Sequence, residues 1–320
     1  MADDYYGKHR GDVRAAAGFG DWVAFVTAHP DGHPTSVSFA DPNRKKVTDD
    51  PLPCGGVALA VDGTVVLVAG TDRRLYADPE GGKPTPLGDP FPADVAALVP
   101  VADGRVAVLA GPQLFVVARS DGSILQSFDL PGPGTALAAD PTGTWLAAGT
   151  DGGVVAVFDG QDKPEFEPAE AEKLHDGAVT ALLFEPDDLR FFSAGADHKL
   201  LSTHARGRLE PEDKGKGNAH EAPVTAMLRL PGDRFLTGGR DGVIKSWPRA
   251  GGVKPQTLDG VGKVVALALL TDAGRTSAVV LSEDNALRVV RLDADGRFAD
   301  PPGVAIRLYS ALDRARDELK

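Results

Sequence analysis

Residues 175–203 read HDGAVTALLFEPDDLRFFSAGADHKLLST. Three runs of strand length alternate here with two tight turns, and the turns are rich in Asp, Gly, Ala and Pro. The first run, 179–184, is almost continuously apolar, which is typical of a strand that is buried on both faces. Two further strands are predicted at 189–193 and 199–203, each after a turn that reverses the chain.

The same unit recurs seven times along the chain. The last position of its second turn is an Asp in every copy but the third, and neighbouring copies are 38 to 46 residues apart. These seven positions are Asp31, Asp72, Gln113, Asp151, Asp197, Asp241 and Asp284. A period of about 40–45 residues with strand-length runs is typical of a β-propeller, in which each repeat forms one blade. We therefore predict an all-β fold, a seven-bladed β-propeller of four-stranded antiparallel blades.

The propeller is expected to fill residues 1–309 as a single domain. The first copy is the least regular, and its first strand is expected near 12–17. Two longer charged connections, 159–173 and 206–218, are predicted to be solvated outer loops. The outer strand of the last blade comes either from 304–308 or from part of 4–10, and we favour 304–308.

The last residues, 310–320, have a helical pattern. Leu308, Leu312, Ala315 and Leu319 lie three or four positions apart, and charged residues fill the positions between them. A helix of this length is marginal by itself. We expect a short amphipathic C-terminal helix that either docks on the propeller or leads into a further domain.

Composition limits the classes of partner. The formal charge is −12, with 34 Lys and Arg against 46 Asp and Glu. Nucleic-acid binding depends on Lys and Arg that neutralise phosphates, so it is not expected, whereas a basic partner fits the negative charge. The single Cys54 fits a reducing compartment. No run approaches the roughly 18 apolar residues of a membrane span, and no signal peptide is visible. We expect a cytoplasmic monomer that does not bind membranes.

A more specific pattern appears in the sixth copy and, in part, in the fifth. The sixth copy has a His four residues before its first strand, a Thr four residues before the turn Asp, and a Trp six residues after it. These residues are His220, Thr237, Asp241 and Trp247. The fifth copy has three of the four, His175, Ser193 and Asp197, with Thr203 in place of the Trp. The spacing resembles the hydrogen-bonded tetrad of WD40 repeat proteins. This resemblance implies a structural chain of buried polar side chains, which is tolerable only if every member is satisfied.

The resemblance also implies a function. WD40 proteins typically bind peptides or partner domains on the face formed by these turns and by the loops that enter each first strand. The corresponding residues are His29, Arg73, Thr150, Asp176, Glu221, Arg240 and Glu283. We expect a non-enzymatic interaction scaffold that binds a protein or peptide there, and we expect no catalytic residue, cofactor or metal. Arg73 and Arg240 are of interest because Arg is enriched among the residues that dominate interface energies.

Two other functions stay open. Some propellers hold a calcium or zinc ion in their channel and hydrolyse lactones or esters, but most first strands here begin with Val or Ala rather than with metal ligands. The channel of a propeller can also sense a small molecule.

Four short motifs contain residue types that can carry chemistry. His29-Pro30-Asp31-Gly32-His33 has zinc-ligand residue types, and 293–300 opens like a calcium loop but lacks its closing Glu. Both coincide with predicted turns, and we favour the interpretation that they are ordinary turns without a metal. Cys54 is expected to be a buried apolar side chain. The Gly-rich 131–134 is not followed by a helix, so a phosphate-binding role is not supported.

Overall fold

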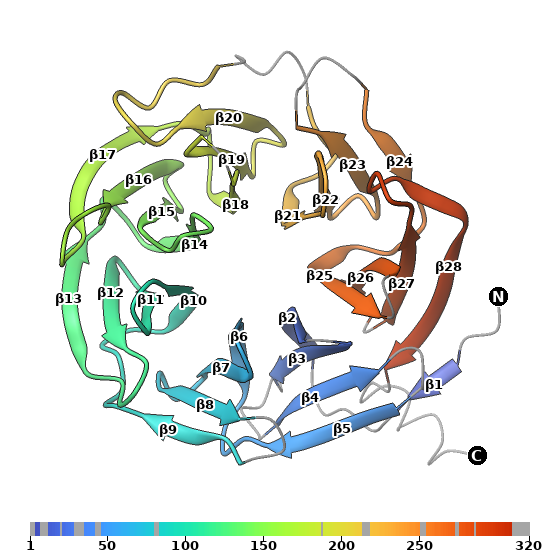
Figure 1. Ribbon diagram of the computed structural model, residues 1–320, viewed down its shortest axis with the longest axis horizontal. Helices are drawn as coiled ribbons and strands as arrows, with labels where there is room; N and C mark the ends of the chain where they lie inside the picture. The colour runs from blue at the N-terminus through green and yellow to red at the C-terminus, as the bar shows by residue number, and fades with distance from the viewer. Residues whose placement is uncertain are drawn as a thin grey trace. The chain divides into compact units, whose positions relative to one another are not determined.

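A computed structural model of the protein describes residues 4–6, 12–19, 21–28, 35–41, 46–79, 83–186, 188–212, 218–249, 254–272, 275–284 and 286–308. In these ranges the chain forms seven β-sheets (Figure 1), which confirms the predicted all-β, seven-bladed propeller. The described residues include no helix, and hence none with the length and apolar character needed to cross a bilayer. The helix expected at 310–320 lies outside the described residues.

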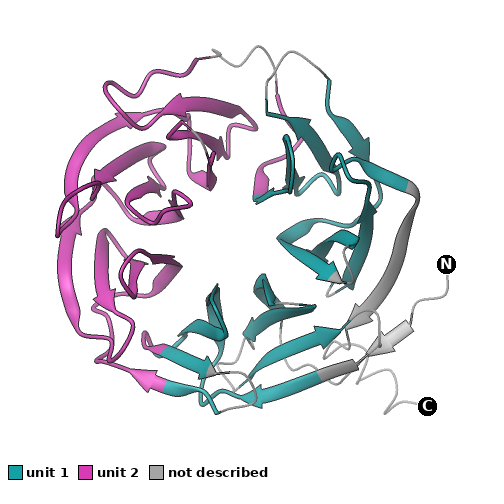
Figure 2. Ribbon diagram, in the orientation of Figure 1, with its two compact units in different colours: residues 1–72, 76–85, 226–320 teal, residues 73–75, 86–225 magenta. Residues whose placement is uncertain are grey.

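Two compact units make up the chain (Figure 2). Unit 1 consists of residues 1–72, 76–85 and 226–320, and unit 2 consists of residues 73–75 and 86–225. Unit 1 holds blades 1 and 7 and most of blades 2 and 6, whereas unit 2 holds blades 3, 4 and 5.

The strands of unit 1 follow one another within each sheet in chain order. Blade 1 consists of β2 (Asp12–Phe19), β3 (Trp22–Ala28), β4 (Ser36–Asp41) and β5 (Lys46–Pro51). Blade 2 consists of β6 (Gly56–Asp62), β7 (Val65–Gly70), β8 (Leu75–Pro79) and β9 (Thr85–Leu87). Blade 6 consists of β21 (Val224–Arg229), β22 (Arg234–Gly239), β23 (Ile244–Pro248) and β24 (Gln256–Leu258). Blade 7 consists of β25 (Val264–Asp272), β26 (Arg275–Ser282), β27 (Ala286–Leu292) and β28 (Phe298–Leu308).

Both uncertain strands of unit 1 are now placed. The first strand of blade 1 is β2, as expected from the sequence. The outer strand of blade 7 is β28, which confirms the favoured source at 304–308. The N-terminal strand β1 (Asp4–Tyr6) also joins this sheet, as a fifth strand that runs parallel to β28, with Asp4 opposite Ile306.

Unit 2 follows the same plan. Blade 3 consists of β10 (Val95–Val101), β11 (Arg105–Ala110), β12 (Gln113–Ala118) and β13 (Ile124–Asp129). Blade 4 consists of β14 (Gly134–Ala139), β15 (Trp145–Thr150), β16 (Val154–Asp159) and β17 (Glu167–Lys173). Blade 5 has three strands in the described residues, β18 (Val179–Phe184), β19 (Arg190–Gly195) and β20 (Leu200–His204).

One of the two predicted outer loops is partly wrong. The second half of 159–173 is β17, the outer strand of blade 4. Its side chains are almost all exposed, so it has no apolar run to mark it, but its backbone pairs with β16 from Glu167 to Lys173. The other segment, 206–218, forms no strand in its described part and makes a single bridge, between Pro211 and Thr203.

The core lies between neighbouring blades of each unit. Blades 1 and 7 share a cluster that includes Phe25 and Leu281, and blades 3 and 4 share one that includes Leu109 and Phe158. The first and second strands are apolar because they pack into such clusters between blades of the same unit. This packing fixes the strands and leaves the turns between them as the variable parts of each blade.

Candidate functional site

The turn end of a blade is defined here as the turn between its second and third strands together with the loop that enters its first strand. The turn Asp has one role in three blades: its Oδ1 accepts a hydrogen bond from the backbone N–H two residues later. The three pairs are Asp197 with Lys199 (3.2 Å), Asp241 with Val243 (3.2 Å) and Asp284 with Ala286 (3.3 Å). Asp favours such turns because its side chain can replace a backbone acceptor.

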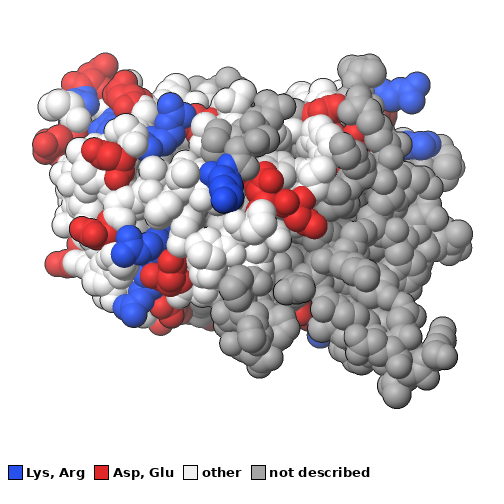
Figure 3. Space-filling model, turned by 90° about the horizontal axis from the view of Figure 1, so that it is seen from below, with Lys and Arg blue, Asp and Glu red and all other residues white. Residues whose placement is uncertain are grey.

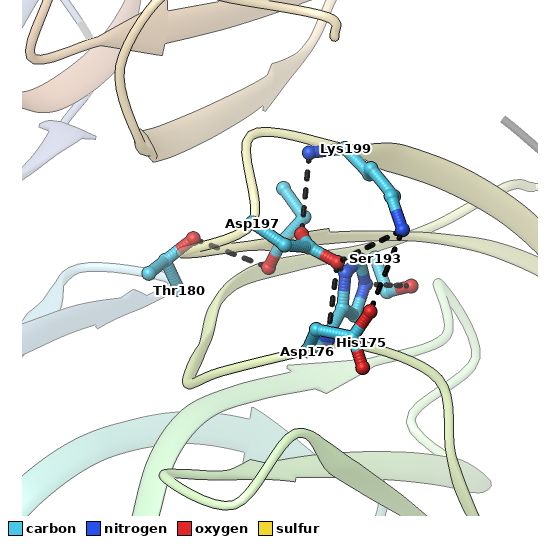
Figure 4. A network of polar contacts seen from close by, with 7 residues as sticks. His175, Asp176, Thr180, Ser193, Asp197 and Lys199 are labelled. Carbon is cyan, nitrogen blue, oxygen red and sulfur yellow. Dashed lines mark hydrogen bonds and ion pairs between the residues drawn. The ribbon is translucent and has the colours of Figure 1, made fainter. Parts of the chain in front are cut away.

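Blade 5 adds a buried polar chain to its turn (Figure 4). Nδ1 of His175 lies 2.9 Å from Oδ1 of Asp197, and Nε2 of His175 lies 2.9 Å from Oγ of Ser193. With Asp197 ionised, Nδ1 of His175 carries a proton and donates a hydrogen bond to this carboxylate. The backbone N–H of Asp176 also donates to Asp197, at 3.1 Å. The structure therefore brings together the three residues that the sequence pattern grouped in this blade.

The charge on Asp197 is stabilised by this chain. Burial by itself works against ionisation, but the hydrogen bond and charge of His175, with the N–H groups of Asp176 and Lys199, outweigh it and lower the pKa of Asp197. At the predicted Trp position, Thr203 is buried and its hydroxyl has no hydrogen-bond partner among the described residues.

Blade 6 shows the Trp part of the pattern. Nε1 of Trp247 donates to Oγ of Thr237 at 2.8 Å, and Thr237 is fully buried. His220 is also buried, in the loop that enters this blade.

Blade 2 fills the same position with different chemistry. The thiol of Cys54 lies 3.5 Å from Oδ1 of Asp72, and the hydroxyl of Tyr76 donates to Oδ2 at 2.6 Å. A Cβ placed on Gly70 would meet both Asp72 and Cys54, just as one on Gly195 would meet Asp197 and His175. Cys54 thus occupies the His position, which the sequence did not reveal. Burial, followed by the charge of Asp72, raises the pKa of Cys54 and makes the thiol unreactive.

Blade 7 uses an arginine instead. Nη2 of Arg288 lies 3.0 Å from Oδ2 of Asp284, and Nη1 donates to Oγ of Ser282 at 2.6 Å. Arg288 lies four residues after its turn Asp, the position that Tyr76 has in blade 2. Burial opposes ionisation of Asp284, but the hydrogen bonds from Arg288 and Ser282 outweigh it and lower its pKa.

A second kind of contact, which the sequence analysis missed, ties the outer strand of one blade to a Phe at or next to the outer strand of the following blade. The side-chain amide of Gln126 on β13 donates to the backbone oxygen of Phe166 and accepts from its N–H, both at 3.0 Å. Gln256 on β24 makes the same two bonds with Phe298, at 3.3 and 2.7 Å. Each Gln precedes its Phe by about one repeat, and that recurrence is the signal that could have identified the pair.

Exposed charge is present at the turn end of blade 2, on residues 73–75, which belong to unit 2. Arg73 follows the turn Asp and has a left-handed backbone, with φ of 66°. Its Nη1 donates to the backbone oxygen of Pro92 at 3.1 Å, and its Nε lies 3.8 Å from Asp94 in the loop that enters blade 3. The corresponding position in blade 6 is Gly242, with φ of 79°, a conformation that glycine adopts without the steric penalty of a side chain.

A similar contact links blades 6 and 7 in unit 1. Nε of Arg240 lies 3.2 Å from Oε1 of Glu283, and Nζ of Lys263 lies 3.7 Å from Oε2. The side chains of Arg240 and Lys263 are 60% and 63% exposed. Two exposed cations therefore share one carboxylate here.

The remaining predicted surface residues differ in accessibility. Thr150 is wrong as a partner contact, because it is 1% exposed and its hydroxyl accepts from the N–H of Val154 at 3.1 Å. Asp176 and Glu221 are exposed, and Asp176 lies 3.7 Å from Nζ of Lys199. His29 lies outside the described residues. On the part of the surface that Figure 3 describes, Lys and Arg are interspersed with Asp and Glu.

The possible metal loops give no site in the part of the chain that the structure describes. Asp293 accepts hydrogen bonds from the N–H groups of Asp295 and Arg297, at 2.9 and 2.8 Å, so this segment is a self-contained hairpin turn. The motif at 29–33 lies outside the described residues. No three His, Cys, Asp or Glu side chains converge as metal ligands within the described ranges.

Comparison with known families decides the nature of one repeat. Residues 214–248 match the family described as WD domain, G-beta repeat. The chain contains a WD40 repeat. The matched segment includes β21, β22 and β23, so the WD40 repeat coincides with blade 6. WD40 propellers typically serve as protein-interaction scaffolds and are generally non-catalytic. No curated protein sequence matches the chain significantly.

Proposed function

We propose that this WD40 propeller is a non-enzymatic scaffold that binds a protein or peptide through exposed charged side chains at its turn ends. The observation that supports this most directly is Arg73. An L-residue in the left-handed region carries a backbone cost of about 1–2 kcal/mol, which a glycine would avoid. A functional contact between this exposed guanidinium and a binding partner would explain why the backbone cost is retained at this position.

The ion pairs at the turn ends are available for exchange. Arg73 and Asp94 have side-chain exposures of 49% and 95%. Solvated pairs of this kind contribute about 0–1 kcal/mol, so a partner can replace either member at little cost. The exposed carboxylates of Asp94 and Asp176 favour a partner that also carries basic side chains.

The test uses a substitution that fits the backbone. Arg73→Gly removes the guanidinium and suits a φ of 66°, so its melting temperature should stay within a few degrees of wild type. The control is Arg208→Gly, at a 73% exposed arginine that is paired with Glu210, beyond the end of β20. Affinity capture from the native host lysate is quantified for wild type and both variants. A protein retained by wild type and Arg208→Gly but lost by Arg73→Gly supports the proposal. Equal capture by wild type and both variants would contradict a role for the blade 2 turn end.

A further inference from the structure

An unpaired carboxylate is buried between blades 1 and 2, in unit 1. Asp78 on β8 is fully buried, and neither of its carboxylate oxygens has a hydrogen-bond partner among the described residues. Burying an isolated carboxylate ion is so unfavourable that such a group ordinarily binds a proton or a counter-ion. The surroundings of Asp78 must therefore neutralise it.

The strand registers identify what faces Asp78. Val37 on β4 is paired with Asp50 on β5, so both side chains project from the same face of blade 1. Val37 packs in one cluster with Tyr76 of blade 2. Tyr76 and Asp78 are two residues apart on β8 and thus share a face. Asp50 and Asp78 therefore face each other across the interface.

Among the residues that the structure describes, the other groups near Asp78 offer it no charge compensation. Asp49 projects from the opposite face of β5, where its Oδ1 accepts from Ser38 at 2.7 Å. On β8 itself, the Tyr76 hydroxyl is bound to Asp72. On β4, Val37 and Phe39 of this cluster are uncharged, and Asp41, two residues beyond Phe39 on the same face, is a further buried carboxylate and not a cation.

A proton held by Asp78 explains the arrangement better than a metal ion. Calcium takes six to eight oxygen ligands, and the described residues bring no third His, Cys, Asp or Glu to the pair. When two carboxylates share a buried site, one holds a proton because both cannot ionise cheaply. Burial and the charge of Asp50 raise the pKa of Asp78 to about 7. Burial, followed by the charge of Asp49, also raises the pKa of Asp50.

We propose that Asp50 and Asp78 form a proton-dependent latch between blades 1 and 2, which is closed while the pair holds a proton and weakens when both carboxylates ionise. The direction follows from linkage. A carboxyl whose pKa is higher in the folded state contributes stability that is fully present below its unfolded pKa of about 4 and is lost as the pH rises through the folded value. Because β8 follows the Asp72 turn and Tyr76 binds that Asp, opening the latch loosens this turn as well.

Unfolding is measured at half-unit steps from pH 5 to pH 8 for wild type, Asp78→Asn and Asp50→Asn. The control is Asp259→Asn, at an exposed carboxylate in the same unit. Between pH 5 and 7 the folding equilibrium constant of wild type should fall up to tenfold per pH unit relative to Asp78→Asn. Asp50→Asn should show a weaker pH dependence than wild type. Parallel profiles for wild type and Asp78→Asn would overturn the proposal.

A second measurement covers the case in which Asp78→Asn does not fold. Amide hydrogen exchange of wild type is compared at pH 6 and 8, corrected for the intrinsic rate. Protection in β5 and β8 should fall at pH 8, while protection in β11 of unit 2 should not. Unchanged protection in β5 and β8 would contradict the latch. A rise in melting temperature on addition of calcium chloride at pH 8 would show that a cation neutralises the pair in place of the proton. That result would also overturn the proposal.

Discussion

Replacing Asp197 by Ala tests whether the polar chain of blade 5 holds its turn. The substitution removes one carboxylate that accepts from Nδ1 of His175 and from the N–H groups of Asp176 and Lys199. The side chain of Asp197 is 6% exposed and that of His175 is fully buried, so water cannot readily take over these bonds. The imidazole would then be left with Ser193 as its only side-chain partner in this network.

The expected cost follows from that burial. Hydrogen bonds to a charged group contribute about 1.5–3 kcal/mol each, and they are not additive when they share one acceptor. Removing one member of a buried charged pair typically costs about 3–5 kcal/mol. We therefore expect Asp197→Ala to lower the free energy of unfolding by about 3–5 kcal/mol.

Blade 4 provides a matched control in the same unit. Asp151 occupies the same turn position but is exposed, and there the Thr150 hydroxyl accepts the N–H of Val154. Asp151→Ala should change stability by no more than about 0.5 kcal/mol, the usual range for surface substitutions.

Urea unfolding followed by circular dichroism measures both changes, with the slope of the transition used to check that the unfolded state is unaltered. A double-mutant cycle with His175→Ala should give a coupling energy of about 1–3 kcal/mol. If Asp197→Ala cost no more than Asp151→Ala, the turn would be held by its backbone, and the reasoning from the buried chain would be refuted.

Three further outcomes are expected. Gln126→Ala should lower the free energy of unfolding by about 1–3 kcal/mol, because the partly buried backbone of Phe166 loses both bonds. Gln256→Ala should cost less, because its bonds to Phe298 are exposed and water can replace them. Gln113→Ala, whose side-chain bond to Asp129 is also exposed, is the control in urea unfolding. Cys54 should react with iodoacetamide only at the rate of unfolding, since it is buried and its pKa is raised, and mass spectrometry of labelled protein at increasing urea checks this. The free energy of unfolding should fall as the pH drops through the lowered pKa of Asp284. A carboxylate whose pKa is depressed in the folded state contributes its full stability above its unfolded pKa and loses it as the pH falls through the folded pKa. Asp284→Asn should flatten the acid limb of the profile of unfolding free energy against pH.

The repeat pattern predicted the blades well because their core strands are defined by apolar runs. The first strands at 179–184 and 264–270 were placed almost to the residue, since each is an almost unbroken apolar run. The outer strand β17 could not be found in this way. Its Glu and Ala side chains lie in solvent, and only its backbone pairing with β16 makes it a strand.

The turn ends were predictable in position but not in chemistry. The Asp spacing located each turn, and the His and Ser of blade 5 followed from a known spacing. The partners of Asp72 could not be predicted in this way, because Cys54 and Tyr76 match no familiar pattern and become neighbours only through the fold. Thr150 was misjudged for a related reason: a Thr next to a turn Asp can bind the turn backbone instead of facing solvent.

The turn Asp is bound by a different kind of side chain in each of three blades. Blade 5 uses a histidine, blade 2 a thiol and a phenol, and blade 7 a guanidinium, each on its own aspartate. A substitution of one of these partners therefore acts on the turn of one blade and leaves the side-chain bonds of the other two in place. The aspartate is the part that all three turns have in common, so a change that acts on the carboxylate affects them together.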